Sequence, residues 1–351
     1  MKRSEFVLGG MVSLAALAIP SLATGNWQEE SRVQDTQEII DGVLEQADID
    51  NARFNGPRVF GFGQFRWSYD SLGIAGFSVH KAVIGVEGEI SDEWSYLISG
   101  QFTPDTSFEI RDAYVDGNFG QWGVRAGRFR LPFMAEWQVN EPDLLGNDYS
   151  ILAYTFGQGR SEGVQVSYSF SEDVVAKFAY SDGFQTPNNA PFNNQDWGVV
   201  GRVEVSVDKN FIVGGALAYN STENLGENFT WTLDSTIRFN SQLHAFVSYT
   251  GRSDDVSGDG WGVLVQGGYD VHEDGTIFAQ YQFGDISGGR SQLSIASLGY
   301  THMFNPSVRW TTQVGYSFNA IDASWNVAET GWNYTRSSGQ SLLTSQLTIS
   351  F

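Results

Sequence analysis

The sequence predicts an all-β protein, a transmembrane antiparallel β-barrel of about sixteen strands that follows a short N-terminal helical segment. Three observations support this class. After residue 25 no run reaches the roughly 18 consecutive apolar residues that a membrane-spanning helix needs. From residue 55 onward, apolar residues alternate with small or polar residues at a period of two. The links between these alternating segments are short and long in turn, as in barrels of the outer membrane.

The first 23 residues predict an export signal. Lys2 and Arg3 form a positive start, residues 6–18 are apolar, and small residues lead to Ala23, after which we expect cleavage. The alternative is an N-terminal anchor helix, but the apolar run is short and no stop-transfer pattern follows it. The signal therefore predicts a chain exported toward the bacterial outer membrane.

Charge excludes one class of partner. The chain has 20 basic and 41 acidic residues and a net charge of -21. A nucleic-acid-binding protein would need the opposite sign, so no nucleic-acid partner is expected. The absence of cysteine fits an exported protein that does not depend on disulfides.

Residues 24–54 form a polar, acidic N-terminal segment that we place in the periplasm. Val33, Ile40 and Ala47 are spaced seven apart, which indicates a short helix. Two or three heptads are too few for an independent coiled coil. The pattern leaves open whether this segment oligomerises, plugs the barrel or is a linker.

Residues 55–351 are predicted to form the barrel. In one segment Ala82, Ile84 and Val86 alternate with residues of the other face, so one face suits lipid and the other water. A soluble barrel alternates too, so the links have to decide between the two. Short links such as 91–93 alternate with longer ones, which we expect to be external loops. The longer links are predicted at 70–75, 103–107, 132–160, 183–195, 221–227, 252–259, 285–290 and 319–338.

Aromatic residues gather near the ends of the predicted strands, where their amphipathic rings would lie at the level of the lipid headgroups. With both termini in the periplasm, Trp94, Trp310 and Phe351 fall near one interface, and Phe102 and Tyr316 near the other. Phe351 ends an alternating strand, and such a terminal Phe resembles the signal recognised by the barrel-assembly machinery. Outer-membrane lipid and that machinery are therefore expected partners.

Several motifs carry a resemblance to a known family. They are the segments FEIRDAYVDG at 108–117, GVRAGRFRLPF at 123–133 and GRSEGVQVSYSF at 159–170. Between Phe77 and Phe133, and again at 159–170, the chain resembles the family of phosphate-selective porins O and P. The resemblance implies a homotrimer of sixteen-stranded barrels whose third loop folds into the lumen.

The charges of the chain depart from that family. Its paired basic residues correspond to His80 and Lys81 here, and the chain has only four lysines. Phosphate selectivity would need a dense ladder of Arg and Lys, because each anion must exchange its water for charge-assisted contacts. The resemblance therefore supports the fold and the pore more than phosphate as the solute.

A barrel of this size leaves an aqueous channel, so the candidate site is its narrowest point. We expect the long third loop, 132–160, to fold inward and form a constriction, with acidic residues opposite a basic wall. The acidic residues of this predicted constriction are Glu136, Glu141, Asp143 and Asp148. The alternation of the strands places these basic residues on the lumen wall: Arg66, Lys81, Lys177, Arg202, Arg238 and Arg309.

The predicted function is that of an outer-membrane porin of a Gram-negative bacterium. It would allow passive diffusion of small hydrophilic solutes or ions, with a mild cation preference because of the negative net charge. The alternatives are an anion- or phosphate-selective porin, which needs the inward basic residues to cluster near the loop, and a structural or adhesive barrel with a blocked lumen. No nucleophile elbow, phosphate-binding loop or metal-spaced His is evident, so no enzyme, metal or cofactor is expected.

Overall fold

The computed structural model describes residues 56–102, 108–184, 196–222, 226–254, 258–286, 291–335 and 338–351. The predicted signal (1–23) and the whole of the predicted periplasmic segment (24–54) lie outside these residues. The chain divides into two units, Val59–Ser350 and a second made of Met1–Arg58 and Phe351, and the barrel is described by itself.

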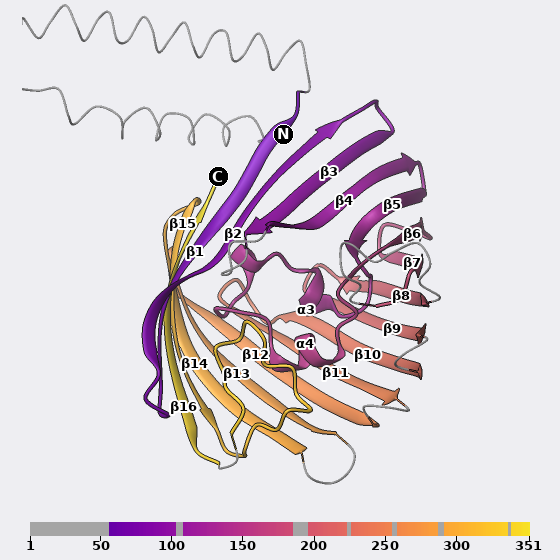
Figure 1. The fold of residues 1–351 in the computed structure, drawn as a ribbon. Coiled ribbons are helices and arrows are strands. Elements are labelled where there is room, and N and C mark those ends of the chain that lie inside the picture. The colour runs from indigo at the N-terminus through magenta and orange to yellow at the C-terminus, as the bar shows by residue number, and fades with distance from the viewer. Residues whose placement is uncertain are drawn as a thin grey trace, which may run out of the picture. The chain divides into compact units, whose positions relative to one another are not determined.

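Sixteen antiparallel strands form a closed barrel, in which each strand is hydrogen-bonded to the next and β1 pairs with β16 (Figure 1). Closure satisfies every edge, which an open sheet in lipid does not achieve. This confirms the predicted fold class. The strands are β1 (Arg58–Asp70), β2 (Ala75–Glu89), β3 (Trp94–Phe102), β4 (Phe108–Phe119), β5 (Trp122–Arg130), β6 (Arg160–Ser169), β7 (Val174–Ser181), β8 (Trp197–Asp208), β9 (Phe211–Thr222), β10 (Gly226–Arg238), β11 (Leu243–Asp254), β12 (Gly260–His272), β13 (Gly275–Ile286), β14 (Ser291–Asn305), β15 (Val308–Ser317) and β16 (Gln340–Ser350).

The two faces of the strands have opposite character. On the outer face, Leu233 is 57% and Leu298 55% exposed, as suits side chains that lipid covers. On the inner face, Thr232, Gln280 and Thr311 are buried in the barrel. This is the reverse of a soluble barrel. The two faces differ in character because successive side chains of a strand point to opposite faces.

The links differ in length between the two ends of the barrel. At one end, called the turn end, the links are short, such as 90–93 and 120–121. At the other end, called the loop end, three links are long: 131–159, 182–196 and 318–339.

The remaining loop-end links correct the prediction of a strict short and long rhythm. Residues 71–74, 223–225 and 287–290 are as short as the turns, which have two to four residues, and 103–107 and 255–259 are only one residue longer than the longest turn. The reason is that the strands continue beyond the roughly 9–11 residues that cross a bilayer, so polar residues expected in loops are part of the sheet. Strands β2 and β14 have 15 residues each.

Two long links carry the structure inside the barrel. The link 131–159, called the inner loop, contains helix α3 (Ala135–Gln138), the 3₁₀ turn η1 (Glu141–Asp143) and helix α4 (Ile151–Phe156). Figure 1 shows the strands curving around α3 and α4. The link 318–339 is called the last loop. Within the described ranges, no helix has the length and apolar character to span a bilayer.

Candidate functional site

One side of the inner loop is apolar and packs against the barrel wall. Leu152 and Phe156 are buried together with the inward-facing Leu264 of β12 and Leu293 of β14. A Cβ on Gly262 would lie 2.5 Å from Cδ2 of Leu152, so the Leu152 side chain would have to shift if residue 262 were not glycine. The cluster extends over β7 to β9, β12 to β14 and β16, includes Phe129 of β5, and fills that part of the lumen.

The last loop belongs to the same apolar cluster. Its Trp325 and Ile321 are fully buried, and the Trp325 ring meets that of Phe156 edge-on at 6.0 Å. Burial of an aromatic ring removes a large apolar area from water, which stabilises the loop inside the barrel. The two loops therefore pack together mainly on the wall from β7 onward, and Phe129 is the one residue of the β1 to β6 wall among the buried members of this cluster in the described part of the chain.

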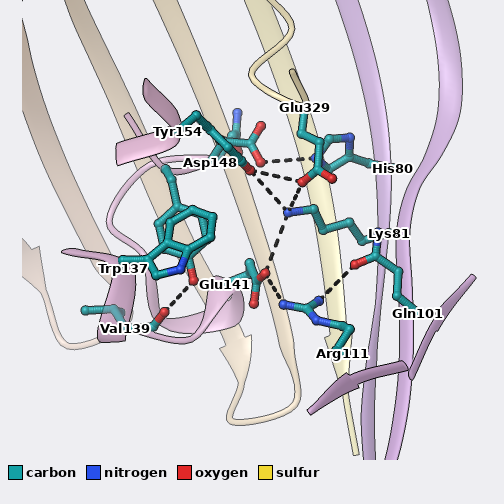
Figure 2. A network of polar contacts seen from close by, with 12 residues as sticks. His80, Lys81, Gln101, Arg111, Trp137, Val139, Glu141, Asp148, Tyr154 and Glu329 are labelled. Carbon is teal, nitrogen blue, oxygen red and sulfur yellow. Dashed lines mark hydrogen bonds and ion pairs between the residues drawn. The ribbon is translucent and has the colours of Figure 1, made fainter. Parts of the chain in front are cut away.

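The polar side of the inner loop converges on Glu141 (Figure 2). Its carboxylate forms ion pairs with Arg111 of β4, with Arg130 of β5 at 3.0 Å and with Lys81 of β2 at 3.6 Å. Burial by itself would raise the pKa of Glu141, but the positive charges of Arg111, Lys81 and Arg130 outweigh it and hold the pKa well below its ordinary value. Glu141 is therefore a permanent negative charge bound to the β1 to β6 wall.

Asp148 makes a second contact with the same wall. It pairs with Arg66 of β1 at 2.6 Å and with His80 of β2 at 3.1 Å. Burial tends to raise the pKa of Asp148, but Arg66 and His80 lower it further than burial raises it. Two predicted loop carboxylates thus lie against the predicted basic residues Arg66 and Lys81.

Glu329 brings the last loop to this network. It pairs with Lys81 at 2.7 Å and accepts a hydrogen bond from the Tyr154 hydroxyl at 3.0 Å. Its backbone has φ 65°, a left-handed conformation that costs roughly 1–2 kcal/mol for a residue with a Cβ. The contacts with Lys81 and Tyr154, together with a hydrogen bond from Arg66 to its carbonyl, hold it there.

The other two predicted loop carboxylates lie elsewhere. Glu136 is buried within the inner loop, and its carboxylate accepts two hydrogen bonds from Ser150. The backbone N–H of Ser150 donates at 2.7 Å and the Ser150 hydroxyl at 2.6 Å. Burial raises the pKa of Glu136 to about 7, although the Ser150 bonds oppose the shift. Asp143 is exposed on η1. Glu136 therefore joins the two helices of the loop and does not face the basic wall.

The remaining predicted wall residues separate into two groups. Arg309 donates to the carbonyls of Pro142 and Leu145, and Arg202 donates to that of Phe133, so both bind the inner loop through its backbone. Arg202 also pairs with Asp234 at 2.7 Å.

The second group does not meet the loop in the described part of the chain. Lys177 pairs with Glu204 at 3.0 Å. Arg238 is exposed at the turn end of β10.

Sequence reasoning missed Arg111 and Arg130, the two residues whose ion pairs with Glu141 are shortest. A β-bulge explains the first. Gly100 pairs with Ile110 and Ser99 with Asp112, so Arg111 is an extra residue in β4 and its side chain reaches the lumen as that of Asp112 does. The adjacent charges Arg111 and Asp112 are the signal in the sequence, because strict alternation would turn one of them toward lipid.

Two cavities lie between the inner loop and this wall, and both are lined by Arg111, Glu141 and Arg160. The loop-end cavity, of about 240 Å³, also touches Gln101 and Glu329. The turn-end cavity, of about 220 Å³, is lined by residues nearer the other end of the strands. They therefore adjoin at the level of Glu141.

Basic residues outnumber acidic ones around both cavities. The loop-end cavity has four basic and three acidic lining residues, and the turn-end cavity four and two. The chain as a whole has a net charge of -21, so the local sign at this junction is opposite to the overall sign.

Comparison with known proteins gives the following matches. A family model described as Gram-negative porin matches residues 48–322. An anion-selective porin from Comamonas acidovorans has 15% identity and a TM-score of 0.65, with 84% of this chain and 99% of that chain covered. OmpF of Salmonella typhi, solved in complex with daunomycin, has 15% identity and a TM-score of 0.64, with 85% and 98% covered. The outer-membrane channel DcaP of Acinetobacter baumannii has 11% identity and a TM-score of 0.57, with 84% and 97% covered. A search of curated proteins finds no match.

Proposed function

Because the chain belongs to the Gram-negative porin family, we propose that solutes cross it between the inner loop and the β1 to β6 wall, past Glu141. The chain is an outer-membrane β-barrel channel for passive diffusion. The observation that supports this route is the pair of cavities that adjoin at Arg111, Glu141 and Arg160. The other side of the inner loop is largely packed against apolar wall residues. A further polar cavity of about 370 Å³ lies there, lined among others by Gln158, Thr230 and Arg252, but it shares no lining residue with the turn-end cavity.

We propose that the channel prefers anions. A passing ion responds mainly to charges within about 8 Å, because salt screens charges farther away at physiological ionic strength. Basic residues exceed acidic ones around both cavities, whereas the excess of acidic residues belongs to the chain as a whole. The mild cation preference expected from net charge is the opposing proposal, and it requires the distant charges to dominate.

Reversal potentials decide between the two. The purified protein is reconstituted in a planar bilayer under a tenfold KCl gradient, and the zero-current voltage gives the ratio of chloride to potassium permeability. A ratio above one supports the local-charge proposal. A ratio below one supports the cation preference and assigns control to residues outside the two cavities.

A phosphate-selective channel is the finer form of the anion proposal. The clustering of Lys81, Arg111 and Arg130 beside the inner loop favours it. These cations are, however, already paired with Glu141. Inorganic phosphate should then reduce the chloride current at concentrations where sulfate has little effect. Equal effects of the two anions would indicate general anion preference.

A barrel with a blocked lumen is the second candidate function. The full burial of Trp325 and Leu152, where the last loop and the inner loop fill part of the lumen, favours it. Purified protein without any conductance, but correctly folded, would establish this function in place of diffusion.

We also propose a homotrimer, as the resemblance of the motifs implies. One structural neighbour, OmpT of Vibrio cholerae, was solved in a trimer form, and it matches at 13% identity with a TM-score of 0.62. Unheated protein in mild detergent should migrate at three times the mass of the 38.7 kDa chain, less its signal. Migration as a single chain would contradict the trimer.

A further inference from the structure

We propose that the loop-end cavity is a binding subsite for a small cyclic carboxylate, a hexuronate being the class that fits its groups best. This inference rests on the proposed route past Glu141 and adds a solute class to it. Three features of the cavity carry the inference: an aromatic wall, an arginine whose terminal nitrogens are free, and a net positive lining.

The aromatic wall consists of Trp137 and Tyr154, which line the cavity, with Tyr149 packed behind them. The ring centroids of Trp137 lie 4.6 Å from Tyr149 and 5.4 Å from Tyr154. The Tyr149 hydroxyl donates to the Val139 carbonyl at 2.5 Å and the Tyr154 hydroxyl to Glu329 at 3.0 Å, so the rings are fixed. Aromatic faces carry partial negative charge and attract the C–H groups on one face of a pyranose or other ring.

Arg160 supplies the anion-binding group. Its Nε donates to Asp112 at 3.0 Å, while neither terminal nitrogen has a partner in the part of the chain that the structure describes. The side chain lines both cavities, so these nitrogens border the route. Arg111 and Arg130 differ, because Glu141 and neighbouring acceptors take their terminal nitrogens. A guanidinium whose two terminal nitrogens are both free can bind a carboxylate in bidentate fashion through them.

The rest of the cavity suits hydroxyl groups. Gln101 and Asn326 present amides, and Glu109 and Glu329 present carboxylates that accept hydrogen bonds from sugar hydroxyls. The volume of about 240 Å³ suits a single ring. A compact inorganic anion would leave the aromatic wall unused, and a neutral sugar would leave Arg160 without its anion. A solute with a ring, hydroxyl groups and one carboxylate would contact the aromatic wall, the hydrogen-bonding side chains and Arg160 together.

Block of the ion current tests the inference. Sodium D-glucuronate, D-glucose and sodium acetate are added to the reconstituted full chain at constant ionic strength. Glucuronate should reach half-block at a concentration at least tenfold below that of either other solute. If acetate matches glucuronate, the aromatic wall does not contribute. If glucose matches it, Arg160 does not contribute. Either result overturns the proposal.

Variants place the site. Arg160→Gln should raise the half-blocking concentration of glucuronate at least tenfold, and Trp137→Leu at least fivefold, whereas Trp137→Phe should retain most of the affinity. Lys209→Gln removes the same charge from the exposed turn-end link and should leave block unchanged. Equal effects of Arg160→Gln and Lys209→Gln would show that block depends on overall charge and would refute the site.

A fluorescence titration separates this inference from the proposed route. Detergent-solubilised protein is titrated with glucuronate, and the Trp137 signal is taken as the difference between the wild type and Trp137→Phe. Saturable change without any conductance would overturn the route and keep the site. Normal conductance with neither block nor fluorescence change would overturn the site and keep the route.

Discussion

Replacing Glu141 with Gln tests whether the junction of the two cavities sets ion selectivity. The substitution keeps the size of the side chain and a hydrogen-bond acceptor, but removes the charge that Arg111, Arg130 and Lys81 share. The loop-end cavity then has four basic and two acidic lining residues, and the turn-end cavity four and one. The pKa of Glu141 is well below its ordinary value, so the wild-type carboxylate stays ionised at mildly acidic pH. The wild type and Glu141→Gln therefore differ by one charge at mildly acidic pH as well.

The size of the effect follows from Coulomb's law. An ion about 5 Å from the carboxylate interacts with it by about 0.8 kcal/mol in water-like surroundings, and by roughly half of that with physiological salt. Loss of the charge favours a passing anion and disfavours a passing cation by that amount each. The permeability ratio of chloride to potassium should therefore rise by about five- to fifteenfold.

The assay is the reversal potential of the reconstituted variant under a tenfold KCl gradient. Glu172→Gln is the matched control, because it removes one carboxylate from the exposed turn-end link at 170–173. Slower migration of the heated than of the unheated variant in gels verifies that the barrel is folded. An unchanged ratio for Glu141→Gln, or an equal change for Glu172→Gln, would refute the local-charge reasoning.

Three further perturbations test other parts of the structure. The folded-state pKa of Glu136, raised from 4.5 to about 7, corresponds to about 3 kcal/mol of stability, present in full below pH 4.5 and lost as the pH rises through 7. Glu136→Gln should remove this pH dependence from thermal unfolding and from current fluctuations; an equally pH-dependent variant would contradict it. Trp325→Ala deletes a fully buried ring and should destabilise the packed last loop by about 3–5 kcal/mol. Single-channel conductance should then rise. Unchanged conductance and unchanged protease resistance would argue against the packing role. Deletion of Phe351 should lower the amount of barrel assembled in the outer membrane without changing the conductance of the channels that do assemble, and wild-type assembly levels would count against the assembly signal.

The barrel could be predicted because its cause is local. Each strand shows its membrane face through alternation, as at Leu233 and Leu298, and that pattern does not depend on distant residues. Loop lengths were harder to predict, because polar residues beyond the membrane remain part of the sheet when the adjacent strands extend as far. The strict rhythm of the links was therefore wrong for three loop-end links, 71–74, 223–225 and 287–290.

The packing of the lumen could not be predicted from a binary pattern. Leu264, Leu293 and Ile295 occupy inward positions that a water-filled barrel would give to polar residues. Their burial is explained by the apolar side of the inner loop, which is distant in sequence but packs in the same cluster inside the barrel. An inward-facing apolar residue in a membrane strand is thus a usable sign that a loop covers it.

The sequence by itself determined the class of the molecule: the alternation of its strands, the charge of its loops and the presence of acidic residues in the long third loop. Only the tertiary structure decided which of those acidic residues meet the wall. Glu141 and Asp148 do, Glu136 turns to Ser150, and Arg111 reaches Glu141 through a bulge that strand parity does not reveal. The physical reason is that the face to which a strand side chain points alternates along the local sequence. The pairing of charges instead depends on distances between segments that come together only when the barrel closes.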